Sequence, residues 1–507
     1  MKRLMFSAFA AVALAGVVSA ATVYSVSDRT LTIDVPTGET NSVETARLAC
    51  ANNNEVTNIV KTGRGSLLMD DKSAIPLYEG DIHVDEGAWV IACINALGKL
   101  SSSGDGSGVG EVFVGNGGAL VAGGTDRTIS NKGKKISIAG DGVDGEGALV
   151  LTSTAGDFEK NVFGTNIVLT DNATMGILPK QNVYFNGAAF ILNGYKLSFR
   201  YNRTDGQRSF VFNGSSSSCE IVSPGEIELH DRAQLIFQGG TSMLGNEGTV
   251  TFNDSSSFSS SGMRGRYEWP MIWDSTAPVT IAKQTTSDSV TNRNSWHGPV
   301  RLDKTMKVAI TASGTFGLFG PVTGDGGLDV YWNATAKPSV PTNFVNLGNA
   351  GSVFRGGVRA KDLVVNVMER DAVPPEGGAF ALTNCALNFD SAKNYELPDG
   401  IFHIDGDRAV KGGSGKWNTF VKTGDGTVDY DSAICADVLD LRDGVFKITA
   451  QQSAFAGLVE GVGYFGTTGE AFDAANNKNV AYTNRIVMSP IGAYEGSGYW
   501  THKRPEW

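Results

Sequence analysis

The chain has 507 residues, a formal net charge of −11 and an apolar fraction of 41%, and 64 of its residues are glycine. An acidic exterior without a stripe of lysine and arginine cannot release phosphate counterions, so the composition argues against a nucleic-acid partner. The same net charge would repel an anionic polysaccharide unless metal ions bridged the two.

The first twenty residues have the pattern of a secretory signal peptide. Lys2 and Arg3 form a short basic region, and the stretch from Leu4 to Val18 is almost wholly apolar. The residues Val18 to Ala20 form a V-x-A cleavage site, which predicts a mature chain that starts at Ala21. The apolar run has about 15 residues, fewer than the roughly 20 of a membrane-spanning helix, and no later run reaches that length. We therefore predict a secreted or surface-located protein whose mature chain has no transmembrane segment.

Beyond the leader, apolar residues alternate with polar ones in many short stretches separated by glycine-containing turns. The segments from Gly225 to Gly239 and from Gly248 to Phe252 show this alternation clearly. A period of two residues is typical of half-buried strands. The sequence therefore predicts an all-β chain with many short strands.

Comparison of the chain with itself reveals a repeat. The segment from Ile59 to Ile91 reads "IVKTGRGSLLMDDKSAIPLYEGDIHVDEGAWVI", and the segment from Phe420 to Ile448 reads "FVKTGDGTVDYDSAICADVLDLRDGVFKI". Both open with an apolar residue followed by Val-Lys-Thr-Gly-x-Gly, continue into an alternating strand, and close with a strand interrupted by Asp-Gly or Glu-Gly. Self-similarity of this kind indicates stacked repeats.

These segments resemble the autotransporter-associated β-strand repeat, which occurs in the passenger regions of secreted bacterial surface proteins. The good matches are confined to the two copies, at 59–91 and 420–448, and the rest of the chain fits loosely. The matching markers are Lys61, Gly63, Gly65, Tyr78, Gly80 and Gly87 in the first copy and Lys422, Gly424, Gly426 and Gly444 in the second.

The resemblance implies a right-handed parallel β-helix, or β-solenoid, built from irregular glycine-rich repeats. Stacking is also what the physics requires, because one coil cannot bury its own apolar strands. We expect the signal peptide at 1–20, the solenoid at 21–450 with a possible internal boundary near 260–300, and an irregular segment at 451–507 that could begin a further domain. That segment lacks the long alternating strands of the C-terminal barrel that autotransporters carry.

One acidic run could bind calcium. Asp141, Asp144 and Glu146 lie among glycines and would supply the oxygen ligands that calcium prefers. Their spacing is not that of an EF-hand loop, and a turn in which aspartate caps its own backbone explains the same residues. No other cofactor is predicted.

Three tryptophans stand close together beside basic residues. Trp269, Trp273 and Trp296 follow shortly after Arg264 and Arg266. Exposed aromatic rings near arginine can stack on sugars or anchor a partner, so these indoles are candidate contacts to a glycan or a cell-surface partner. The alternative is that they pack over an end or a loop of the solenoid.

The cysteines, at positions 50, 93, 219, 385 and 435, form no metal-binding pattern. Cys50 and Cys93 flank the first repeat and could pair, or could remain free thiols. The pairing among the five stays open.

Two functions compete on these observations. The first is a secreted or cell-surface β-solenoid with a structural, adhesive or display role and no catalytic residues. The second is a carbohydrate-active β-helix enzyme of the polysaccharide lyase or glycoside hydrolase type. It would need acidic or basic side chains from successive coils to converge on one groove. The sequence has no catalytic frame around its scattered histidines, so the first is favoured.

Overall fold

The structure is a computed structural model. It describes residues 21–488 apart from 44, 71–72, 94, 100–108, 123–133, 152–165, 178–182, 187–188, 202–207, 214–219, 223, 239–247, 262–265, 282–293, 312–314, 334–343, 349–351, 373–377, 443–444, 449–457, 462–463 and 468–486. The predicted signal peptide, Gly444 and the end of the chain lie outside the described residues. The chain divides into two compact units, Met1–Phe258 and Ser259–Trp507, which we call unit 1 and unit 2 and describe separately.

Unit 1 consists of short strands with very little helix. Its elements are β1 (Val23–Ser27), β2 (Thr30–Asp34), β3 (Thr40–Ser42), η1 (Thr45–Leu48), α1 (Ala49–Asn52), β4 (Asn58–Thr62), β5 (Ser66–Met69), β6 (Asp81–Ile91), β7 (Val112–Ala122), β8 (Ile136–Gly140), η2 (Val143–Gly145), β9 (Leu149–Leu151), β10 (Ile167–Ile177), β11 (Val183–Asn186), β12 (Ala189–Ile191), β13 (Lys196–Tyr201), β14 (Arg208–Asn213), β15 (Glu220–Val222), β16 (Glu226–Asp231), β17 (Ala233–Gln238) and β18 (Thr249–Asp254). Strand β19 (Ser257–Ser261) spans the boundary between the units.

Unit 2 continues in the same style. Its elements are β20 (Arg266–Tyr267), β21 (Met271–Ser275), β22 (Val279–Ile281), β23 (Ser295–Trp296), β24 (Val300–Leu302), β25 (Met306–Ile310), β26 (Thr315–Leu318), β27 (Val322–Gly324), β28 (Leu328–Trp332), β29 (Phe344–Leu347), β30 (Val353–Phe354), β31 (Val358–Lys361), β32 (Val364–Val367), η4 (Arg370–Ala372), β33 (Ala379–Thr383), β34 (Ala386–Phe389), β35 (Asn394–Leu397), β36 (Asp399–His403), β37 (Arg408–Thr423), β38 (Thr427–Leu441), β39 (Val445–Ile448), β40 (Leu458–Gly461), β41 (Tyr464–Thr467) and β42 (Val487–Met488).

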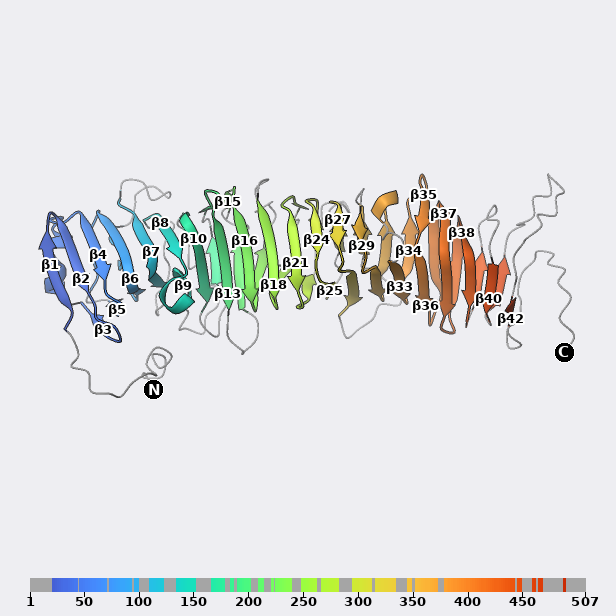
Figure 1. The fold of residues 1–507 in the computed structure, drawn as a ribbon, viewed down its shortest axis with the longest axis horizontal. Helices are drawn as coiled ribbons and strands as arrows, with labels where there is room; N and C mark the ends of the chain where they lie inside the picture. The colour runs from blue at the N-terminus through green and yellow to red at the C-terminus, as the bar shows by residue number, and fades with distance from the viewer. Residues whose placement is uncertain are drawn as a thin grey trace, which may run out of the picture. The chain divides into compact units, whose positions relative to one another are not determined.

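In both units a strand pairs in parallel with the equivalent strand of the next coil (Figure 1). In unit 1 one such ladder runs β2, β4, β6, β7, β8 and β10. In unit 2 three ladders run through successive coils, and they include β20–β23–β26, β21–β24–β27 and β22–β25–β28. Strand β1 differs, because it pairs antiparallel with β2. The predicted all-β, parallel β-helix architecture built from irregular repeats is confirmed.

The core of each unit is the interior of its coils. Strand β13 illustrates the rule, because Leu197, Phe199 and Tyr201 are buried while the residues between them are half-buried. Burying a side chain of this size stabilises the fold by about 1.5–3 kcal/mol, and stacking coils repeats that gain along the ladder.

Amides also form a ladder in unit 2. Asn346, Asn366 and Asn388 lie in register on β29, β32 and β34. The Asn366 amide donates to the Asn346 carbonyl oxygen at 2.8 Å, and the Asn388 amide donates to the Asn366 carbonyl oxygen at 2.9 Å. Such a ladder fixes the register of neighbouring coils, because a slip of one residue would break every bond in it.

Parallel pairing continues beyond residue 450, where the sequence analysis placed the end of the repeat region. Strands β40 and β41 pair in parallel with β38 and β39, and β42 pairs with β40. The described part of the expected irregular segment therefore extends the solenoid ladders.

Candidate functional site

The repeat motif forms a corner around a buried lysine. Lys61 lies on β4 between Ile33 of β2 and Val84 of β6, at a position that faces the interior, and its side chain is 0% exposed. Its ammonium donates to the carbonyl oxygens of Thr62 at 2.7 Å, Gly63 at 2.6 Å and Glu86 at 3.0 Å. A charge removed from water is tolerated only when such partners surround it.

The second copy of the motif builds the same corner in unit 2. Lys422 lies on β37 and is also 0% exposed. Its ammonium donates to the carbonyl oxygens of Thr423 at 2.8 Å and Gly424 at 2.6 Å. The Lys-Thr-Gly sequence is therefore a self-contained device in which the lysine bonds the two carbonyls that follow it in the chain.

Glycine is required at this corner for two different reasons. Gly63 and Gly424 have φ of +72° and +79°, in the left-handed region that side chains disfavour. Gly65 and Gly426 lie against backbone instead, since a Cβ there would lie 2.1 Å from the oxygen of Pro36 and 2.3 Å from the nitrogen of Gly406.

Gly87 closes the first corner. It has φ of +69°, and a Cβ at this position would lie 2.8 Å from the Lys61 ammonium. The sequence analysis identified these residues as repeat markers but did not predict that the lysine is buried.

Burial controls the protonation of the corner lysine in unit 1. It lowers the pKa of Lys61 to about 8, and the negative charges of Asp34 and Glu86 oppose that shift. Lys134 behaves in the same way: its ammonium lies 5.0 Å from the centre of the Tyr78 ring, it donates to the Gly80 carbonyl, and burial lowers its pKa to about 8. Unit 1 thus holds two buried lysines in the first repeat and its surroundings.

The tryptophan cluster is interior, so the prediction that it forms a contact surface is wrong. Trp269, Trp273 and Trp296 are 0%, 0% and 1% exposed, and all three belong to unit 2. The indole nitrogen of Trp296 donates to the Trp269 carbonyl at 2.7 Å, and its ring packs 5.1 Å from that of Tyr267. Trp269, Met271 and Trp273 alternate along the chain and all three lie on the buried face. The residues between them, Pro270 and Ile272, lie on the opposite face and are half-buried.

The proposed calcium ligands do not come together. Within the described ranges, no group of three or more His, Cys, Asp or Glu side chains could hold a metal ion. The Asp141 carboxylate instead accepts a hydrogen bond from the Thr174 hydroxyl, and its main-chain oxygen accepts from Gly147 at 2.8 Å. Asp144 has φ of 54° in the short turn η2. The alternative explanation, that these are turn residues, agrees with this geometry.

The cysteines that the structure describes do not support a disulfide in the first repeat. Cys50, Cys93 and Cys385 are in no disulfide, so the possible pairing of Cys50 with Cys93 is not formed. Cys219 and the side chain of Cys435 lie outside the described residues. Burial raises the pKa of the Cys385 thiol to about 12, which makes it a poor nucleophile.

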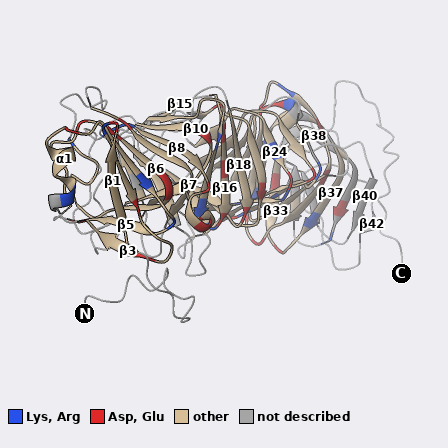
Figure 2. Ribbon diagram, turned by 60° about the vertical axis from the view of Figure 1, so that its left-hand side comes forward, with Lys and Arg blue, Asp and Glu red and all other residues tan. Residues whose placement is uncertain are grey.

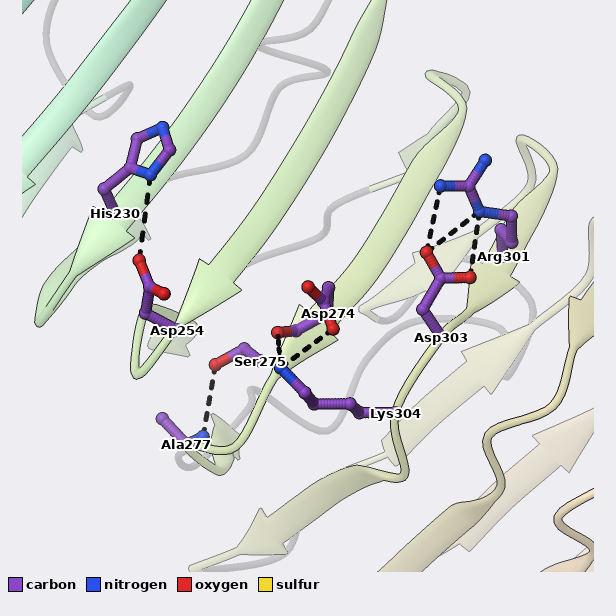
Figure 3. A network of polar contacts seen from close by, with 8 residues as sticks. All are labelled: His230, Asp254, Asp274, Ser275, Ala277, Arg301, Asp303 and Lys304. Atoms are coloured by element: carbon purple, nitrogen blue, oxygen red, sulfur yellow. Dashed lines mark hydrogen bonds and ion pairs between the residues drawn. The ribbon is translucent and has the colours of Figure 1, made fainter.

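The polar side chains of the outer faces form separate small networks (Figure 3). In unit 1, His230 lies 3.0 Å from Glu228 and 3.7 Å from Asp254. In unit 2, Arg301 makes a bidentate pair with Asp303, at 2.9 to 3.1 Å, and Lys304 pairs with Asp274 at 2.8 Å. Each network joins polar groups of its own unit, as structural ion pairs do.

Comparison with known proteins adds no identification. No family model, no curated protein and no solved structure matches the chain. Among the described residues, no helix is long and apolar enough to cross a membrane.

Proposed function

We propose that this protein is an exported, non-catalytic β-solenoid with a structural, adhesive or display role, built from repeats of the autotransporter-associated kind. The observation that carries the proposal is the lysine corner, which recurs at Lys61 and Lys422 with the same carbonyl partners. The described residues that both copies share at this corner hold the coil, so the repeated motif serves the scaffold rather than a reaction.

The position of the first strand supports export. Strand β1 begins at Val23, two residues after the predicted mature N-terminus, so removal of 1–20 leaves every described strand intact. Regular outer faces, repeated along each unit, provide a surface on which a partner of extended shape can lie.

The test has two parts. Mass spectrometry of the protein made in a Gram-negative host should find the mature chain outside the cytoplasm and starting at Ala21, and retention of Met1 in the exported product would overturn the export step. Purified mature protein should release no reducing ends or unsaturated products from pectin, alginate, xylan or host glycans, with or without calcium. Release that disappears when one Asp, Glu, Lys or Arg is replaced would establish an enzyme instead.

A further inference from the structure

Unit 2 carries a group of basic residues that the sequence does not show as a group. Strands β25, β28 and β31 are parallel neighbours, and their register aligns Lys307 with Asp329 and Arg359 in one row and Tyr331 with Lys361 in the next. We call these five residues the β25–β31 face. They alternate with buried residues of the same strands, so all five side chains are on the outer side of the sheet.

The charges of this face have no partner among the residues that the structure describes. Lys307, Arg359 and Lys361 are exposed, Asp329 and Tyr331 are half-buried, and none of the five makes an ion pair or hydrogen bond in the part of the chain that the structure describes. Three other basic residues of unit 2 differ, since Arg301, Lys304 and Arg355 each pair with an aspartate. Basic and acidic residues are interspersed over the strands of both units (Figure 2).

An apolar shelf continues the first row. Ala381 of β33 and Ile401 of β36 follow Arg359 in register, and the Ile401 side chain is 44% exposed. The first row therefore runs from cations to an aliphatic shelf across successive strands about 4.8 Å apart, and Tyr331 and Lys361 lie in the neighbouring row.

We propose that the β25–β31 face binds an acidic polysaccharide. Lys307, Arg359 and Lys361 hold its carboxylate or sulfate groups by charge-assisted hydrogen bonds, which are stronger than neutral ones. The Tyr331 ring packs against the apolar face of a sugar. Asp329 accepts hydrogen bonds from sugar hydroxyls. This inference names the partner of the adhesive role proposed above and rests on it.

The chemistry of the face favours a polysaccharide over a nucleic acid. Asp329 lies in the middle of the cations, where its carboxylate can accept hydrogen bonds from the several hydroxyls that every sugar ring carries, groups in which a DNA backbone is poor. The net charge of −11 also opposes a polymer with the charge density of DNA. The net charge predicts repulsion of acidic polysaccharides too, but screening at physiological salt limits that repulsion to about 8 Å, and the local cations act within it.

The experiment measures retention of the purified mature protein on immobilised polygalacturonate, heparin and neutral dextran, and on single-stranded and duplex DNA. Wild type should bind polygalacturonate or heparin, should not bind dextran, and should be released by about 1 M salt. The variant Lys307→Ala/Arg359→Ala/Lys361→Ala should lose affinity by about tenfold or more. The variant Tyr331→Ala should lose affinity severalfold without a change in the salt dependence.

The matched control is Arg301→Ala/Lys304→Ala/Arg355→Ala, which removes the same charge from ion-paired positions of the same unit. It should retain wild-type affinity within about twofold. Absence of wild-type binding, equal losses in both triple variants, or tighter binding to DNA than to either acidic polysaccharide would overturn the proposal. If the protein is exported and non-catalytic but does not bind an acidic polysaccharide, this inference is wrong and the proposed function remains supported. Cleavage of a bound polymer would contradict the non-catalytic function but not polysaccharide binding by the β25–β31 face.

Discussion

Lysines at the repeat corner and lysines on the β25–β31 face have opposite roles. Lys61 is 0% exposed and bonds three main-chain carbonyls, whereas Lys361 is exposed and bonds nothing that the structure describes. Lys61 lies inside β4 and Lys361 is the last residue of β31. In both strands neighbouring residues face opposite sides of the sheet. The side of the strand on which a lysine lies decides its role. On the inner side, before a Thr-Gly pair, it bonds the main chain of its own corner, and on the outer side it faces solvent and a partner.

The difference in free energy of unfolding between substitutions of interior and exterior residues should be largest for the aromatic residues of unit 2. Replacing Trp296 with Ala removes a buried indole and its hydrogen bond to Trp269, and should lower the free energy of unfolding by about 3–5 kcal/mol. The control, Tyr331→Ala on the outer face, should change it by less than about 0.5 kcal/mol. Denaturant unfolding of both variants measures the difference. Equal stabilities would mean that the tryptophans are not core residues.

The corner glycines should rank next. Gly65→Val and Gly426→Val each place a side chain against the backbone of the preceding coil, and each should cost about 3 kcal/mol. Gly38→Val is a control for unit 1, because a Cβ there meets nothing within 4 Å, although its φ of +81° adds some strain. Thermal melts that match wild type in both corner variants would show that the shared motif has no structural role.

Replacing Lys61 should lower the free energy of unfolding slightly less than replacing a corner glycine with valine. Lys61→Ala leaves a cavity and three carbonyls without their shared donor, for a loss of about 2–3 kcal/mol. Lys99→Ala is the matched control, since Lys99 is an exposed lysine that pairs with Glu79, and it should be nearly neutral. A neutral Lys61→Ala would contradict the structural role of the buried ammonium.

The pH dependence sharpens the same contrast. Burial lowers the pKa of Lys61 from 10.5 to about 8, so between these values the unfolded chain binds more protons than the folded chain. The cost of burying the charge is fully present below pH 8, and stability should rise with pH above it. Wild type should therefore gain stability relative to Lys61→Met between about pH 7 and about pH 9.5 in denaturant titrations. A constant difference would mean that Lys61 titrates at its ordinary pKa.

The contribution of Cys385, in unit 2, to stability should change with pH in the opposite direction. Burial raises the pKa of Cys385 from 9.0 to about 12, so the unfolded chain loses this proton first and the contribution of Cys385 falls as pH rises above 9. Cys385→Ala should remove that fall relative to wild type.

Much of the fold follows from local sequence patterns. Period-two alternation and glycine-containing turns predict many short strands, and the resemblance of the repeats to the autotransporter-associated repeat implies that these strands stack in parallel. Alternation also places Trp269 and Trp273 inside, because Trp269, Met271 and Trp273 share one face of the chain.

The β25–β31 face could not be predicted in the same way. Its members come from three coils, and the coils differ in length: Leu328 pairs with Met306, 22 residues earlier, and Val358 pairs with Leu328, 30 residues earlier. Only the register between strands aligns Lys307 with Asp329 and Arg359. The one local signal is "VRAK" (Val358–Lys361), in which two basic residues alternate with two small apolar ones.

The most direct test of the account measures thermal stability and polysaccharide retention side by side for two variants, Lys61→Met and Lys361→Met. The account predicts a crossed result. Lys61→Met melts at a lower temperature, while its folded fraction retains wild-type binding to heparin or polygalacturonate. Lys361→Met melts within about 1 °C of wild type, because an exposed substitution changes stability by less than about 0.5 kcal/mol, and it binds severalfold more weakly. If the two variants instead lost stability and binding in the same proportion, the division between holding and binding lysines would be contradicted.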